Sequence, residues 1–202
     1  MPGLVLVTAP TEEPITLAEA RAFLRLPADA TGDSALMAEE NSLVNRLIAA
    51  ARREGETVSE RSFVTTTWRL KLNAFPASGE PIRLPRPPLI SVSSITYVAV
   101  DGTSTTLSSS LYAAITSGEV GEVWEAYGES WPSTRDQQDA VTVNYTAGYG
   151  AQSAVPEDLK IAVAELVRYW YERGPGPVFA TLANDMPGSA LRIFRNYWPG
   201  EY

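Results

Sequence analysis

The sequence contains no cysteine and no histidine among its 202 residues. Without cysteine the chain has no disulfides, no thiol nucleophiles and no thiolate metal ligands. Without histidine it also lacks the commonest general base and the commonest metal ligand. Serine–histidine triads, zinc hydrolases and cysteine proteases are therefore excluded. We expect a protein that is not an enzyme and that holds no cofactor and no metal.

Long apolar runs are also missing. No stretch reaches the roughly 18 apolar residues that a membrane-spanning helix needs, so we expect no membrane association. The first ten residues, MPGLVLVTAP, have no basic segment and too short an apolar core for a signal peptide, which indicates cytosolic synthesis. The apolar share of 45% and the charged share of 20% are ordinary for a soluble globular protein.

Basic residues are outnumbered, with 16 lysines and arginines against 24 acids and a net charge of −8. This balance argues against a general nucleic-acid binder, which would carry a basic patch. Residues 80–139 hold eight acids and three arginines, whereas residues 186–202 reverse the sign, with Arg192 and Arg195 against Glu201. An acidic surface repels DNA and would suit a passage that must not grip it.

Helical patterns frame the chain at both ends. Thr16 and Glu19 form a capping box that starts a helix, which must end near Leu26-Pro27. A second helix can be capped by Asp33 or Ser34, and it ends either at Gly55 or near Arg61. After Pro156, an apolar stripe of period 3.6 predicts a long helix that stops before Gly174, and a last short helix follows over about residues 189–197.

Between these helices the period changes to that of strands. Residues 66–72 alternate apolar and polar side chains, as a half-buried strand does. Asp101-Gly102 is a strong hairpin signal after a strand over residues 94–100. Further short strands are expected over residues 111–115, 120–124 and 141–146.

These patterns predict an α+β fold. A small helical core of two N-terminal helices and one long C-terminal helix carries an antiparallel β insertion and an extended C-terminal tail. The expected division is residues 1–61 for the N-terminal helical part, 62–150 for the β-rich insertion, 151–174 for the core helix and 175–202 for the tail.

The stretch VTVNYTAGYG, residues 141–150, has the strand–glycine–helix order of many phosphate sites. It matches neither G-x-x-x-x-G-K-[ST] nor G-x-G-x-x-G, and it contains no lysine. Glu157 and Asp158 stand where a phosphate would bind. We therefore interpret Gly148 and Gly150 as the turn by which the chain leaves the β insertion.

Two groups of side chains could serve an alternative function. Glu119, Glu122, Glu125 and Glu129 could supply an acid and a base, although a solvated acidic face is the simpler interpretation. Trp124 and Trp131 could stack on a sugar or lie at a subunit contact. The alternation of its strand places Trp68 on the inward face, so we expect it to pack in the core.

The C-terminal segment combines aromatic, aliphatic and basic side chains after the rigid GPGP break. Aromatic residues and arginine dominate the energetics of protein interfaces, so the segment could dock on a partner. It could equally fold back as a lid on the core. The candidate partner-binding residues are Leu191, Arg192, Ile193, Phe194, Arg195, Tyr197 and Trp198.

Several motifs in one order resemble the head–tail connector (adaptor, head-completion) proteins of tailed phages and gene transfer agents. The resemblance covers about residues 15–173. Its motifs are ITLAEARAFLRL, the TWRL strand, LPRPPLISVSSI, DAVTVNYTAGYG and the helix start VPEDLK.

The resemblance implies a structural virion protein. Such connectors form a ring, usually of twelve copies, below the portal at the neck of the particle. The ring extends the DNA channel and joins the capsid to a stopper or tail-joining protein, and DNA passes through without sequence-specific binding. The protein would be made in the cytoplasm of the bacterial host. The family commonly docks on the portal through its C-terminal segment, which by position implicates Leu191, Arg192, Phe194, Tyr197 and Trp198.

The rival interpretation is a carbohydrate-binding module or a carboxylate-based hydrolase of the virion, built on the β region. It predicts a ligand-sized pocket lined by Trp124, Trp131 and neighbouring acids.

Overall fold

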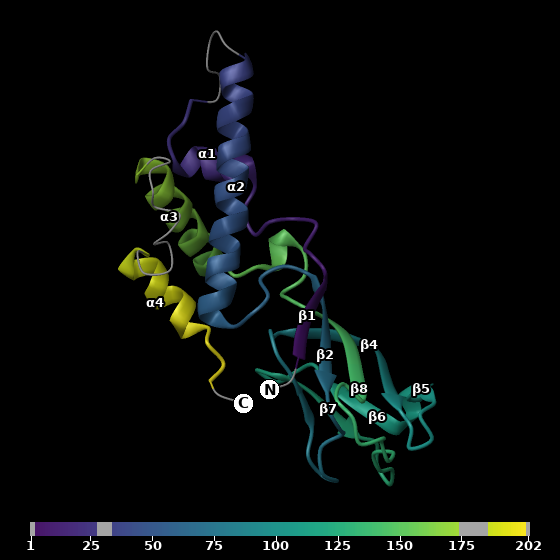
Figure 1. Ribbon diagram of the computed structural model, residues 1–202. Helices are drawn as coiled ribbons and strands as arrows, with labels where there is room; N and C mark the ends of the chain where they lie inside the picture. The colour runs from purple at the N-terminus through teal and green to yellow at the C-terminus, as the bar shows by residue number, and fades with distance from the viewer. Residues whose placement is uncertain (1–2, 28–33, 174–185, 201–202) are drawn as a thin grey trace. The chain divides into compact units, whose positions relative to one another are not determined.

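A computed structural model describes residues 3–27, 34–173 and 186–200, which form two compact units. The helical unit contains residues 12–63 and 151–198, within the described ranges. The β unit contains residues 3–11, 64–150 and 199–200. Figure 1 shows the elements of each unit, and the two units are described separately below.

Helix α1 (Leu17–Phe23) begins with the predicted capping box. The backbone N–H of Glu19 donates to Thr16 Oγ1 at 3.1 Å, and the Glu19 carboxylate accepts from the Thr16 backbone N–H at 2.6 Å. This backbone bond is the main cause of the lowered pKa of Glu19. The reciprocal bonds satisfy backbone donors that a helix start leaves unpaired, so the local sequence sets this boundary.

Helix α2 (Ser34–Ser59) passes through Gly55, so it follows the longer of the two predicted courses. A Cβ at Gly55 would lie 2.8 Å from ring atoms of both Phe63 and Phe194. The glycine is therefore needed for close packing and does not mark the helix end. The buried face of α2 includes Val44, Leu47, Ile48 and Ala51.

Helices α3 (Glu157–Arg173) and α4 (Gly188–Asn196) complete the helical unit. The predicted apolar stripe of α3 is buried, and α2 packs against both α3 and α4. The buried residues of α3 are Leu159, Ala162, Val163, Ala164, Leu166, Val167 and Trp170.

A buried ion network joins α2 to the flanking segments. Arg52 donates to Glu13 and to Glu56, each at 2.7 Å, and Glu56 also accepts the backbone N–H of Phe63 at 2.8 Å. Burial disfavours the charge on Arg52, but the two carboxylates outweigh that penalty and raise its pKa. The network holds the loop after α2 in place, and the two carboxylates compensate the buried charge of Arg52.

The β unit contains two antiparallel sheets (Figure 1). The five-stranded sheet has the order β1-β2-β8-β4-β5 and the three-stranded sheet the order β3-β7-β6. The strands are β1 (Gly3–Thr8), β2 (Thr66–Leu72), β3 (Ile82–Leu84), β4 (Leu89–Val98), β5 (Ser104–Thr106), β6 (Tyr112–Ile115), β7 (Gly121–Glu125) and β8 (Val141–Ala147).

The alternating patterns correctly predicted β2 and β8, and the hairpin at Asp101-Gly102 is present. Asp101 Oδ1 accepts the backbone N–H of Thr103 at 2.8 Å, and Gly102 has φ 92°. Strand β4 begins at Leu89, five residues before the expected start, because it carries two register irregularities that interrupt a simple alternation. No strand was predicted for β1.

The two sheets share one hydrophobic core. Val141, Val143 and Tyr145 of β8 are fully buried, and the Tyr145 hydroxyl donates to the Pro85 carbonyl oxygen at 2.7 Å. Figure 1 shows helices in one part of the chain and antiparallel sheets in the other, which confirms the predicted α+β class.

Within the described residues, no helix has the length and apolar character to cross a membrane.

Candidate partner-binding site

The C-terminal segment is anchored on the helical unit by one aromatic ring. Phe194 of α4 is fully buried, and its ring stacks on Phe63 with centroids 5.9 Å apart and an interplanar angle of 26°. Ala190, one turn earlier, is also fully buried. This face of α4 therefore forms part of the helical core, as the lid interpretation expected for the segment.

Tyr197, at the end of α4, contacts the rest of the helical unit through its hydroxyl, its ring and its backbone carbonyl. Its hydroxyl lies 2.7 and 3.0 Å from the two carboxylate oxygens of Asp158 on α3. The Arg61 guanidinium lies 5.9 Å from the centre of the Tyr197 ring and donates to the Tyr197 carbonyl oxygen. The terminus of the helix is thus positioned by two charged residues of the same unit.

The opposite face of α4 is open to solvent. Arg192 and Arg195 are exposed, and neither forms an ion pair with a residue that the structure describes. Trp198 is 46% exposed although it is a large aromatic side chain. Residues three apart share a helix face, so the two arginines present their charges side by side. Leu191 and Ile193 are half-buried.

The seven candidate residues are thus divided by the structure. Phe194 is inside the helical unit and is not part of any exposed surface, whereas Arg192, Arg195 and Trp198 form a basic and aromatic surface, here called the α4 face. A role in binding a partner stays a prediction for all seven. Composition did not separate Phe194 from Trp198, because both are aromatic and only their packing differs.

The glycine turn after β8 is built for a close backbone approach. Gly148 has φ 123°, and a Cβ there would lie 2.3 Å from the carbonyl oxygen of Val64. Its N–H donates to Pro88 O at 2.9 Å, and Gly150 O accepts from Thr65 N at 3.0 Å. These bonds occupy the backbone groups, as expected for a structural turn and not for a phosphate loop.

The carboxylates of the β unit are engaged in structural contacts. Glu125 accepts the backbone N–H groups of Trp131 at 2.8 Å and of Gly79 at 3.1 Å, and the first of these bonds is the main cause of its lowered pKa. Glu122 accepts from Trp124 Nε1 at 2.9 Å. Their hydrogen-bond capacity is directed to the chain itself.

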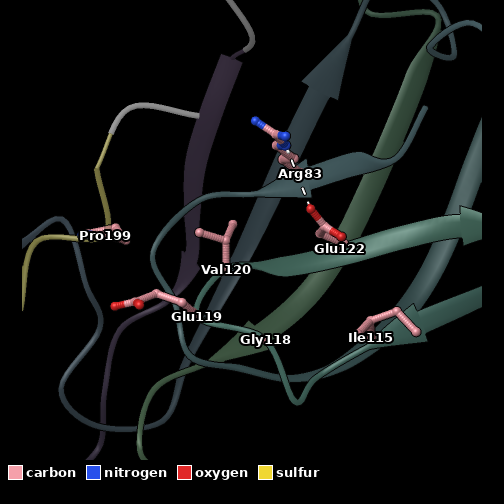
Figure 2. A pocket seen from close by; sticks show the side chains of 7 residues that line it. All are labelled: Arg83, Ile115, Gly118, Glu119, Val120, Glu122 and Pro199. Carbon is pink, nitrogen blue, oxygen red and sulfur yellow. Dashed lines mark ion pairs between the residues drawn. The ribbon is translucent and has the colours of Figure 1, made fainter.

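A depression of about 300 Å³ lies in the β unit. Figure 2 shows the side chains that line it, where Glu122 points to Arg83 and Glu119 points away from both. The ion pair between Arg83 and Glu122 spans 3.7 Å. Catalysis by two carboxylates requires both groups to flank one substrate bond. This divergent arrangement does not favour the hydrolase interpretation. In the described ranges, no cluster of three or more acidic or histidine side chains could hold a metal ion.

The tryptophans pack within the β unit. Trp68 contacts the core, as predicted, and lies beneath the guanidinium of Arg86 at 5.7 Å. Trp131 stacks on Phe75 with centroids 5.0 Å apart and an angle of 3°, and its buried indole N–H has no acceptor among the described residues. A ring covered by Phe75 offers less surface for a sugar, so nothing here favours the carbohydrate-binding interpretation.

One exposed surface was missed from the sequence. Strand β1 leaves three consecutive aliphatic side chains between 44% and 48% exposed, Val5, Leu6 and Val7. It lies at the edge of the five-stranded sheet and pairs with β2 alone. The uncharged run GLVLVT was the available signal, but it lacks the alternation that marks a half-buried strand.

The chain is similar over its full length to proteins of gene transfer agent (GTA) particles. A chain in the neck of an empty GTA particle, computed with C6 symmetry, matches with a TM-score of 0.77 and 27% identity, covering 99% of this chain and 97% of that one. A chain in the neck of a native GTA particle, computed with C12 symmetry, matches with a TM-score of 0.69 and 26% identity, with the same coverage. A chain in the virion of a native GTA particle matches with a TM-score of 0.71 and 26% identity, covering 98% of this chain and 96% of that one.

None of the curated proteins compared matches this chain. The model of the head completion protein family matches residues 15–197, which is most of the sequence. The chain therefore belongs to the head completion protein family.

Proposed function

We propose that this protein is a head–tail connector at the neck of a phage-like particle, where copies form a ring below the portal and join the capsid to the tail. The observation that carries the proposal is the likeness to chains of GTA necks, which extends over 99% of this chain and includes both units. Necks with C6 and C12 symmetry are consistent with a ring of twelve copies. The likeness therefore supports a structural role for the whole chain.

The charge of the chain suits a channel for DNA. A net charge of −8 and the acidic β unit repel phosphates, so DNA can slide past without being held by ion pairs. Catalysis is no part of this proposal, because the carboxylates and tryptophans of the β unit contact the chain itself. The further neck partner below the ring is a stopper or tail-joining protein.

The α4 face is proposed to dock on the portal. Arg192, Arg195 and Trp198 combine exposed positive charge with exposed aromatic area on an otherwise acidic chain. Arginine and tryptophan contribute most strongly where an interface excludes water. The buried ring of Phe194 fixes the helix beneath them, so the docking side chains are held on a rigid element.

Deletion of the gene in cells that produce the particles tests the connector role. We expect filled or empty heads separated from tails in electron micrographs, and restoration of joined particles when the wild-type chain is supplied. Tailed particles formed at the normal frequency without the chain would refute the role.

A further inference from the structure

Strand β1 is an open sheet edge without the usual protection against association. Its six residues carry no charge and no proline, and Val5, Leu6 and Val7 are each more than 40% exposed. Edge strands in soluble proteins are normally blunted by charges, prolines or coverage, because unpaired N–H and C=O groups pair with other chains. An edge of this kind is expected to be covered in the assembled protein.

The other end of the β unit is open as well. Strand β6 contacts β4, and β3 and β2 residues line the same cavity, so β6 lies on the β4–β5 side of the unit and β3 on the β2 side. Figure 1 shows β1 at one side and β5 and β6 at the other. Strand β6 ends the three-stranded sheet and exposes Ile115 by 40%. Of the four edge strands, β1, β5, β3 and β6, the strands β1 and β6 thus lie on opposite sides of the unit.

Charges beside these edges have opposite signs. Along β2, Arg69 pairs with Val5 and Lys71 with Gly3 of β1. Along β7, Glu122 pairs with Ile115 of β6 and Glu125 with Tyr112. Lys71 is offset by an ion pair with Asp139 at 2.8 Å, and Glu122 by one with Arg83 at 3.7 Å. Arg69 bonds the neutral Asn144 at 2.9 Å and Glu125 accepts backbone N–H groups, so within the described residues these two opposite charges are not in ion pairs. Contact between β1 of one copy and β6 of another would bring unlike charges together.

We propose that β1 is the contact between neighbouring copies in the ring, and that its occupant is a second copy of this chain, placed with its β5–β6 end against β1. A head-to-tail contact between two different surfaces generates a ring when the rotation closes. Pairing of β1 with β1 would instead close a two-fold dimer and consume the edge in both copies. The inference rests on the ring of the proposed function and adds the surface that forms it.

Two measurements on the full chain test the contact. Rings are assembled on purified portal and counted by electron microscopy and native mass spectrometry. The variant V5K/V7K places two charges on exposed positions of β1, and we expect its assembly constant to fall at least about tenfold. The control L36K/I161K adds the same charges at exposed positions of α2 and α3, which are 63% and 49% exposed, and should assemble within about twofold of wild type.

Hydrogen exchange gives a readout independent of any substitution. In wild-type rings the amides of residues 4–7 that point away from β2 should exchange at least about tenfold more slowly than in the free chain. Unchanged exchange in assembled rings, or loss of assembly in L36K/I161K but not in V5K/V7K, would overturn the contact. A V5C chain that forms disulfide dimers would also overturn it, by showing two-fold pairing in a protein without other cysteines.

The two proposals fail differently. If the wild-type chain forms no ring with the portal, the ring itself is wrong. If wild-type rings form and V5K/V7K assembles equally well, the ring stands and the β1 contact is wrong.

Discussion

The ring of Phe194 stacks on the ring of Phe63, 5.9 Å between centroids, directly over Gly55 of α2. The glycine leaves the space that the two rings occupy, since a Cβ would approach both to 2.8 Å. The end of α2, the segment just after it and the distant helix α4 therefore meet at one point of the helical unit. This contact holds α4 in place and separates its buried face from the α4 face proposed to dock on the portal.

The stacked pair should be a principal source of stability for the helical unit. We expect F194A to lower the free energy of unfolding by about 3–5 kcal/mol, because it removes a fully buried ring and leaves a cavity. Urea unfolding followed by circular dichroism measures the loss. W198A is the matched control and should cost about 0.5 kcal/mol or less, since Trp198 is 46% exposed. Equal costs for both variants would contradict the assigned packing.

Reversing the charges of the α4 face should weaken portal binding without unfolding the chain. We expect R192E/R195E to reduce affinity for purified portal at least about tenfold, because two desolvated arginine contacts are worth more than about 1.4 kcal/mol together. Biolayer interferometry with immobilised portal measures this change. R46E/R53E makes the same charge change on α2 and should bind nearly as wild type does. Full binding by R192E/R195E would reject the docking role.

Gly148 should tolerate no side chain. We expect G148A to be strongly destabilising, by about 3 kcal/mol or more, because a Cβ would lie 2.3 Å from Val64 O in addition to the strain at φ 123°. G128A separates these causes. Gly128 has φ 79° and open space around its Cβ position, so its substitution should cost only about 1–2 kcal/mol. Thermal unfolding compares the two, and similar midpoints would remove the argument for a close backbone approach.

Acid should release the contacts of Glu125. Its pKa is lowered mainly by the backbone N–H of Trp131, followed by that of Gly79, from an ordinary value of 4.5. The folded state therefore binds the proton less readily, so the contribution to stability is present above about pH 4.5 and is lost as the pH falls through the folded-state pKa. We expect E125Q to lower the melting temperature at pH 7 and the difference from wild type to shrink below about pH 4.

E129Q is the matched control for this pH dependence, because Glu129 is exposed and its carboxylate accepts no backbone N–H from the described residues, unlike that of Glu125. Its melting temperature should follow that of wild type across the same pH range. A constant difference between E125Q and wild type from pH 7 to pH 3 would mean that the carboxylate charge is not what the loop requires.

The sequence correctly predicted those helices and strands that are determined by residues close together in the chain. The Thr16–Glu19 capping box, the stripe of α3 and the alternation of β2 and β8 depend on neighbours within a few residues, and all four elements are present. The α+β class follows from these periods.

Other features depended on contacts between distant residues. Gly55 reads as a helix end because its packing partners, Phe63 and Phe194, cannot be found from local sequence. Strand β1 pairs with a strand more than fifty positions away and buries neither face well, so no alternation marks it. The composition of the tail indicated a docking segment, but the burial of Phe194 and the exposure of Trp198 required the fold.

Electron microscopy of the particle neck is the most direct measurement of the central proposal. A reconstruction that contains this chain should show a ring of its copies, twelve in the expected case, between the portal and the tail, with α4 against the portal. Density for the chain on tail fibres, or a neck without it, would contradict the connector role.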